Sequence, residues 1–421
     1  MIMTVGLGSS QTLSATDTLS LKTKLARSTR HRRIKAFLLV LPALFFLLIS
    51  FIYPIGLMLF RSVHSPDFSN VMHRTAAELQ SWDGVGLPGE RVWAALAADL
   101  REARAQQTVG RAASVVNFEM PAARSLFTKT ARRADALAAP YKDAIIAVDA
   151  NWNNHELWAL MKRLSDPITA RFYLRAVDSR VDQSGAIAAV PAEERIYLQL
   201  FIRTFVIAGI VAVACLLLGY PVAYMLSTLP MRYANMLMIL VLLPFWTSLL
   251  VRTTAWIVLL QNQGVVNSIL VWAGLLQDSG RVQLIFNTTG TVIVMTHILL
   301  PYMILPLYGA MRAIPPSYMR AARSLGADQV TAFLRVFLPL TYPAVGAGCL
   351  IVYILAIGYY ITPALVGGET GTLISNMIAY HMQQSLNWGL AAALASLLLV
   401  GMLALYFVYK RIAGAAEIRL G

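Results

Sequence analysis

The chain has 421 residues, of which 57% are hydrophobic and only 13% are charged. A soluble domain carries about a quarter charged residues, so this composition favours a membrane protein. The formal net charge of +14 raises the question of nucleic-acid binding. The excess positive charge lies at the N-terminus and in short connections between apolar runs, as the positive-inside rule predicts, and we therefore expect no nucleic-acid partner.

The N-terminal region consists of a basic segment and a long apolar run. Residues 1–35 are rich in Ser and Thr and carry a block of Lys and Arg, and we interpret them as a basic cytoplasmic tail. The apolar run over residues 36–61 is too long for a signal-peptide core and has no small-residue cleavage site. It therefore predicts transmembrane helix 1, with the N-terminus held inside by the basic block.

The composition changes after this first span. Residues 61–200 hold 16 of the 21 acidic residues and 17 basic ones, and no stretch within 62–196 is apolar enough to cross a bilayer. Apolar residues at helical spacing over 90–106 and 156–164 predict helices. We expect residues 62–196 to be a helical extracytoplasmic insertion between spans one and two, with a packed core of its own. Its role stays open between a structural cap and a docking surface.

Five further apolar segments complete the prediction of an all-α integral membrane protein with six transmembrane helices. Pro244 interrupts one of them, and a short apolar segment over 265–276 could be re-entrant or interfacial. We place a five-helix core over 197–412 and a cytoplasmic C-terminus over 413–421. The predicted spans are residues 201–226, 236–259, 291–313, 342–363 and 388–409.

The orientation follows from the charges of the connections. Arg232, Arg312 and Lys410 lie in connections on the predicted inner side, whereas the connection between spans five and six carries no Lys or Arg. Six spans put both termini on one side of the membrane. We therefore expect both termini to be cytoplasmic.

The connection between spans four and five, residues 314–340, has the pattern of two short helices joined by a turn. Ala321 and Ala322 form a face of small residues, Gly326 permits a sharp reversal, and Pro339 precedes the next span. A loop fixed in this way to two spans can pass the motion of a partner into the membrane region.

This loop resembles the Glu-Ala-Ala (EAA) loop of binding-protein-dependent ABC importer permeases, which have a MetI-like fold and lie in the bacterial inner membrane. Ala321, Ala322, Gly326 and Pro339 match the family pattern in order and spacing, whereas Arg320 stands where the family has Glu. The resemblance implies that the loop over 314–340 couples the chain to an ATPase, and we call it the coupling loop.

Further segments extend the resemblance over most of the chain outside the insertion. Residues 218–224 (LGYPVAY) are similar to the family in general, and residues 243–248 (LPFWTS) and 361–368 (ITPALVGG) to its spermidine/putrescine branch. A polyamine is therefore the leading substrate. Polyamine permeases commonly have an acidic residue near Tyr359, so another small solute, such as an opine or an amino-acid derivative, stays an alternative.

Five residues are candidates for the translocation path: Trp246, Thr247, Arg252, Tyr359 and Tyr360. Arg252 follows a broken span and would be costly in lipid, so it either lines a cavity or reaches the outer interface. Tyr359 and Tyr360 offer aromatic faces that can bind a cation.

The sequence predicts a transport subunit and no enzyme. It has no G-x-x-x-x-G-K-[ST] phosphate loop, its six histidines are scattered, and Cys215 and Cys349 lie far apart, so we predict no catalytic, cofactor-binding or metal-binding residues. The resemblance implies that ATP is bound by a partner ABC ATPase dimer. It also implies a second permease subunit, an extracytoplasmic solute-binding protein and membrane lipid as partners.

Two rivals come from other classes. A secondary transporter would show an inverted repeat and charged residues inside its spans, and neither is evident. A membrane-anchored sensor would need a cytoplasmic output domain, for which both predicted cytoplasmic ends are short.

Overall fold

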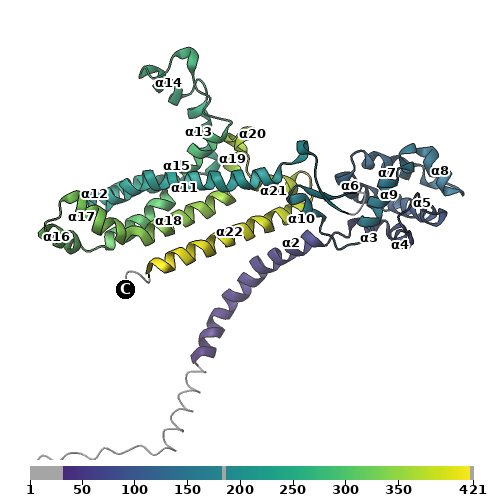
Figure 1. Cartoon of the computed structure of the whole chain (residues 1–421), viewed down its shortest axis with the longest axis horizontal. Coiled ribbons are helices and arrows are strands. Elements are labelled where there is room, and N and C mark those ends of the chain that lie inside the picture. The colour runs from purple at the N-terminus through teal and green to yellow at the C-terminus, as the bar shows by residue number, and fades with distance from the viewer. Residues whose placement is uncertain (1–31, 183–185, 418–421) are drawn as a thin grey trace, which may run out of the picture. The chain divides into compact units, whose positions relative to one another are not determined.

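The computed structural model describes residues 32–182 and 186–417. It is built mainly from helices (Figure 1). The predicted basic tail lies almost entirely in residues 1–31, outside the described residues, and the last four residues of the predicted C-terminal segment do so too.

The chain forms two compact units, and the boundary between them falls inside the first apolar helix, Arg32–Val63, at Phe60. This helix contains a π turn, η1 (Leu48–Ile52), followed by α2 (Tyr53–Val63). The π turn precedes Pro54, which has no N–H to donate and whose ring crowds the preceding turn. The helix extends the predicted first span at both ends and is long and apolar enough to cross a membrane.

The insertion, residues 62–196, is mostly helical, as predicted, and ends in a two-stranded antiparallel hairpin that the sequence did not reveal. Its helices are α3 (Asp67–Val71), α4 (His73–Ser81), α5 (Glu90–Ala105), α6 (Val109–Glu119), α7 (Ala123–Arg132), α8 (Tyr141–Val148), α9 (His155–Leu164) and α10 (Arg171–Ala176). Short 3₁₀ turns lie at η2 (Ala134–Ala136), η3 (Ala150–Asn153) and η4 (Ala192–Glu194), and the strands are β1 (Ser179–Val181) and β2 (Ile187–Ala189).

Three tryptophans form the centre of the insertion. Trp93, Trp152 and Trp158 are fully buried, and the ring centroids of Trp93 and Trp158 lie 4.4 Å apart. Two of the indole N–H groups find acceptors deep in the core: Trp152 donates to the hydroxyl of Thr130 at 2.8 Å, and Trp158 to the backbone carbonyl of Trp152 at 2.9 Å. Buried indoles need such partners because an unpaired N–H is costly. The predicted packed core is therefore present.

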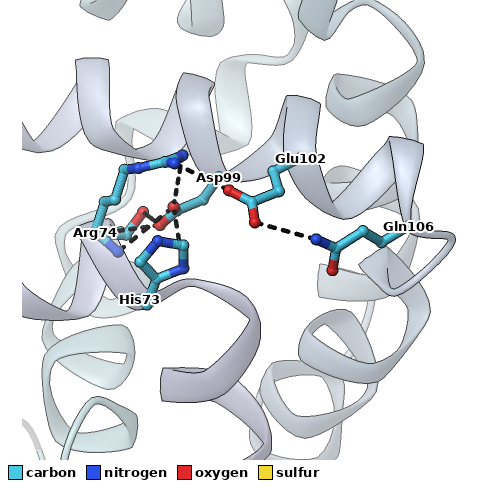
Figure 2. Close-up of polar contacts among 6 residues, drawn as sticks. His73, Arg74, Asp99, Glu102 and Gln106 are labelled. Atoms are coloured by element: carbon cyan, nitrogen blue, oxygen red, sulfur yellow. Dashed lines mark hydrogen bonds and ion pairs between the residues drawn. The ribbon is translucent and has the colours of Figure 1, made fainter.

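A buried carboxylate from α5 holds the N-terminus of α4 (Figure 2). Asp99 Oδ2 accepts hydrogen bonds from the backbone N–H and the hydroxyl of Thr75, both at 2.7 Å. Arg74 lies 3.5 Å from Asp99 and 3.0 Å from Glu102. A negative charge at a helix N-terminus is stabilised by the unpaired amides and the helix dipole. Because Asp99 is fully buried and bonded to the start of α4, the cluster orders this helix.

The remaining helices form the core bundle, in which α11 (Tyr197–Thr228), α15 (Thr288–Ala313) and α18 (Leu338–Gly358) pack on one another (Figure 1). With α13–α14, α22 and the first helix, the described residues contain six helical segments able to cross a membrane, as predicted. The other elements are α12 (Met231–Leu242), η5 (Leu243–Trp246), α13 (Leu249–Leu260), α14 (Val265–Trp272), η6 (Asp278–Gly280), α16 (Pro316–Ser324), α17 (Gln329–Ala332), η7 (Phe333–Phe337), α19 (Ile361–Val366), α20 (Gly368–Gly371), α21 (Ile374–Gln383) and α22 (Trp388–Glu417).

Small residues allow the central helices to approach closely. A Cβ added to Gly348 would lie 2.7 Å from the sulfur of Met303, and one added to Gly219 would lie 3.1 Å from the Met303 side chain. Glycine on α11 and α18 therefore makes room for a methionine of α15, the most buried of the six spans. Close backbone approach through small residues is the usual way for helices to associate in lipid.

Spans three and five differ most from the prediction in their boundaries. The sequence predicts span three over 236–259 with a break, but α12 ends before the 3₁₀ turn at Pro244, and the candidate span is Leu249–Trp272, which takes in the short segment expected to be separate. Span five ends at Gly358, because Tyr359 has extended backbone angles before α19 begins.

Candidate coupling loop and translocation path

The coupling loop folds as two short helices around a glycine. Pro316 lies at the first position of α16, where its missing N–H costs nothing, and the helix ends at Ser324. Gly326 follows with a φ of +92°, a left-handed conformation that strains any residue with a Cβ. Space is not the reason for glycine, since a Cβ there would meet nothing within 4 Å. The predicted reversal thus rests on backbone conformation alone.

Asp328 starts the second helix of the loop, α17. Its carboxylate accepts hydrogen bonds from the backbone N–H groups of Val330 at 3.1 Å and Thr331 at 3.4 Å. Hydrogen bonds from Thr331, and then from Val330, lower the pKa of Asp328. Asp328 is the only acidic residue between positions 314 and 340, so the one carboxylate of the loop is occupied by its own backbone.

An aromatic cluster connects the loop to the core bundle. Phe333 and Phe337, at the two ends of the π turn η7, stack at a centroid distance of 5.6 Å. The ring of Tyr224 on α11 meets each of them edge-on at 5.2 Å. Nearby, the hydroxyl of Tyr220 lies 3.1 Å from that of Thr341. The loop and α11 are thus joined by closely packed rings.

Sequence reasoning did not assign this contact. Tyr220 and Tyr224 lie in the LGYPVAY segment that carries part of the family resemblance, four residues apart on one face of a helix. That spacing is a signal for a shared partner, but the sequence offers no way to find the partner about a hundred residues further on.

The candidate path residues separate into two groups. Tyr359 and Tyr360 line a small cavity of about 160 Å³ together with Leu249 of α13. Trp246 is 89% exposed and does not line this cavity. Thr247 is also exposed, and its hydroxyl bonds to the carbonyl of Pro244 at 2.8 Å. The cavity is smaller than the roughly 300–1,000 Å³ that ligand pockets occupy.

Arg252 is half-buried on α13 and incompletely paired. Its Nε is buried and makes no hydrogen bond among the described residues. One turn further along α13, the indole of Trp256 donates to Nδ1 of His297 at 3.0 Å, so this intramembrane histidine has a packing partner. A buried guanidinium nitrogen without an acceptor is costly, which marks Arg252 as a polar group of this region with unused hydrogen-bonding capacity.

A second polar contact, within the core bundle beside its junction with the insertion, was not predicted. His381 of α21 forms hydrogen bonds at both ring nitrogens, with Tyr197 at 2.9 Å and Ser385 at 2.8 Å. Burial, and then the charge of Arg175, lower the pKa of His381 to about 4. The imidazole is therefore neutral at pH 7.

The junction between the insertion and the core bundle contains tight apolar packing. A Cβ on Gly389, at the start of α22, would lie 2.3 Å from the ring of Phe172 on α10. Beside it, the hydroxyl of Tyr173 accepts a hydrogen bond from Ser396 at 2.9 Å. The last helix of the insertion is thus packed against α22.

Comparisons with known proteins decide the family. The family described as the binding-protein-dependent transport system inner membrane component matches residues 198–416, which is just over half of the chain. The chain belongs to this family. It is therefore a permease, a multi-pass membrane subunit of an ABC importer and not an enzyme. The match covers the core bundle and leaves out the first helix and the insertion.

Curated relatives agree over the same region. The spermidine/putrescine transport system permease protein PotB of Haemophilus influenzae is 40% identical over 217 residues, 51% of this chain and 75% of that protein. PotB of Escherichia coli strain K12 is 34% identical, over 51% of this chain and 78% of that protein. The inner membrane ABC transporter permease protein YdcU of the same strain is 33% identical, over 52% and 72%.

Among solved structures, a bacterial alginate ABC transporter in complex with an alginate pentasaccharide-bound periplasmic protein is similar. It is 20% identical with a TM-score of 0.42, over 52% of this chain and 78% of that one.

Proposed function

We propose that this permease moves a polyamine such as spermidine or putrescine into the cytoplasm. The observation that carries the proposal is the identity of 33–40% to spermidine/putrescine permeases over three quarters or more of their length. This similarity favours a polyamine over the opine or amino-acid alternative.

The chemistry of the core bundle limits how a polyamine could be held. Between residues 197 and 412 the acidic residues are Asp278, Asp328 and Glu369, and none of them lies in a candidate span. An ammonium group on the path would therefore meet aromatic faces, for which Tyr359 and Tyr360 are placed beside a cavity. Cation–π contacts of this kind are worth about 0.5–2 kcal/mol each, which suits a site that must also release its solute.

The orientation and the partners belong to the same proposal. Both termini lie in the cytoplasm, and the insertion lies outside it. The coupling loop docks on an ABC ATPase dimer, a second permease subunit completes the path, and an extracytoplasmic solute-binding protein delivers the substrate. The basic residues of the predicted inner connections support this orientation.

The test is the uptake of labelled putrescine and spermidine in cells with and without this chain, with unlabelled polyamines and amino-acid derivatives as competitors. The proposal expects saturable uptake that is lost on deletion and restored by the intact gene. Unchanged polyamine uptake, with an ATPase still co-purifying with the chain, would remove the polyamine and keep the importer.

A further inference from the structure

Helix α16 of the coupling loop packs on the core bundle through Met319 but leaves most of its surface uncovered in the part of the chain that the structure describes. It has nine residues, none of which is buried. Tyr318 is 52% exposed, and Leu325, directly after the helix, is 89% exposed. An isolated helix of this length is marginal in water and gains its stability from packing. Most of the surface of α16 is therefore open to a partner.

The charges on this helix have the same sign. Arg320 and Arg323 lie three residues apart, on neighbouring positions of the helix surface, and both are exposed. Neither forms an ion pair among the described residues. The arginines outnumber the one carboxylate of the loop, Asp328. This carboxylate is already occupied at the N-terminus of α17.

A neighbouring arginine shows how a structural arginine is used here. Arg312, at the end of α15, donates to the backbone carbonyl oxygens of Ser227 at 2.9 Å and Leu229 at 3.4 Å, and so ties α15 to the end of α11. Arg320 and Arg323 lie in α16, the helix that follows Arg312. They make no such side-chain contact with residues 32–182 or 186–417. Their guanidinium groups are available to a partner.

The small residues of α16 favour a protein over a lipid surface. Ser317, Ala321 and Ser324 form a stripe of small residues along α16. Helices that lie in a lipid interface instead present rows of Trp, Phe and Leu beneath their basic residues. Small residues flanked by two guanidinium groups allow a protein surface to approach closely and to pair its carboxylates with them.

We propose that the ATPase surface that receives α16 is acidic and places carboxylates opposite Arg320 and Arg323. This inference rests on the proposed docking of the coupling loop and adds the chemistry of the surface it meets. Arg320 replaces a glutamate of the resembling loops, so the charge pattern of this interface is inverted. An ATPase with a basic docking surface would be rejected, since like charges at an interface oppose association.

The test uses the full importer, purified through a tag on this chain with its ATPase co-expressed. The variants are Arg320→Glu, Arg323→Glu and the double change, with Arg335→Glu as the matched control, an exposed arginine of the same loop outside α16. We expect the double change to lower ATPase recovery and ATP-driven uptake at least tenfold, and the control to change them less than twofold. Full recovery of the ATPase with the double variant would overturn the proposal.

A cross-link identifies the partner surface directly. A photoactivatable group on Ala321→Cys should label an ATPase peptide that contains Asp or Glu, and changing those residues to Lys should restore recovery of the double variant. Labelling of lipid, or of a peptide without carboxylates, would refute the acidic surface. If the unaltered chain recovers no ATPase at all, it is the docking itself that fails.

Discussion

The insertion and the core bundle distribute their apolar side chains in opposite ways. In the insertion the largest ones, Trp93, Trp152 and Trp158, are buried, and ion pairs such as Arg104–Asp135 at 2.9 Å lie on the surface. This is the arrangement of a domain in water. Ion pairs elsewhere in the described residues are confined to a loop, at Arg281–Asp278.

The core bundle has small residues where its helices approach most closely, and it exposes many large apolar side chains on its outside. Glycine separates α18 from α15 at Gly348, whereas Met236 and Ile202 are mostly exposed. The hydrophobic effect does not hold helices together in lipid, so close packing must do so. The two regions of the chain are therefore packed for different surroundings, water and lipid. Each should be destabilised by a different kind of substitution.

The largest effect should come from the centre of the insertion. Trp152→Ala removes a fully buried ring and leaves the hydroxyl of Thr130 without its donor. We expect the insertion to lose about 3–5 kcal/mol of stability and to become open to proteases while the spans stay in the membrane. Trp246→Ala, at an exposed tryptophan of the core bundle, should leave protease resistance unchanged. Equal protease sensitivity of the two variants would contradict this difference between the two regions.

The hydrogen-bonded contact between α11 and α21, beside the junction of the two regions, should depend on pH. The pKa of His381 is lowered to about 4, below its usual value of 6.5, so the unfolded chain takes up a proton first as the pH falls. Stability is therefore full above pH 6.5 and declines between pH 6.5 and 4, by about 3 kcal/mol in total. Thermal unfolding in detergent measures this decline, and His381→Asn should flatten it. A pH profile that is the same with and without His381 would contradict the assignment.

A smaller effect is expected at the buried carboxylate of α5. Asp99→Asn keeps the shape but removes the charge at the N-terminus of α4 and one of its acceptor positions, which should cost about 1–3 kcal/mol. Glu102→Gln is the control, because its pair with Arg74 is partly exposed and worth at most about 1 kcal/mol. Hydrogen exchange of the α4 amides measures the effect of both substitutions. Faster exchange in the Glu102 variant than in the Asp99 variant would reverse our ranking.

The smallest expected effect separates conformation from packing. Gly326 and Gly309 both have free space where a Cβ would lie, but only Gly326 has a positive φ. Gly326→Ala should cost about 1 kcal/mol and reduce transport per ATP hydrolysed, whereas Gly309→Ala should be neutral or slightly stabilising in its helix. Coupled transport measured in membrane vesicles tests this, and identical coupling in both variants would remove the conformational role of Gly326.

Local patterns predicted most of the fold. The apolar runs, the helical spacing around Trp93 and the position of Gly326 each depend on neighbours along the chain, and the structure has spans, a helix and a reversal at these places. The sequence indicates the break near Pro244, but α12 separates from α13 because the two residues before α13 are extended.

Long-range partners could not be predicted. Asp99 with Thr75, Tyr224 with Phe333 and Tyr197 with His381 bring together residues that are 24, 109 and 184 positions apart in the sequence. A single sequence states which groups need a partner but not which partner they find. The same limit applies to Arg252, whose Nε has no acceptor within the described residues.

The most direct test of the account is reconstitution of this chain with its ATPase and second permease in proteoliposomes supplied with the solute-binding protein. The account predicts accumulation of labelled putrescine or spermidine that requires ATP and is lost with an ATPase variant unable to hydrolyse it. Polyamine movement without ATP, or ATP hydrolysis stimulated by the loaded binding protein without any polyamine accumulation, would contradict it.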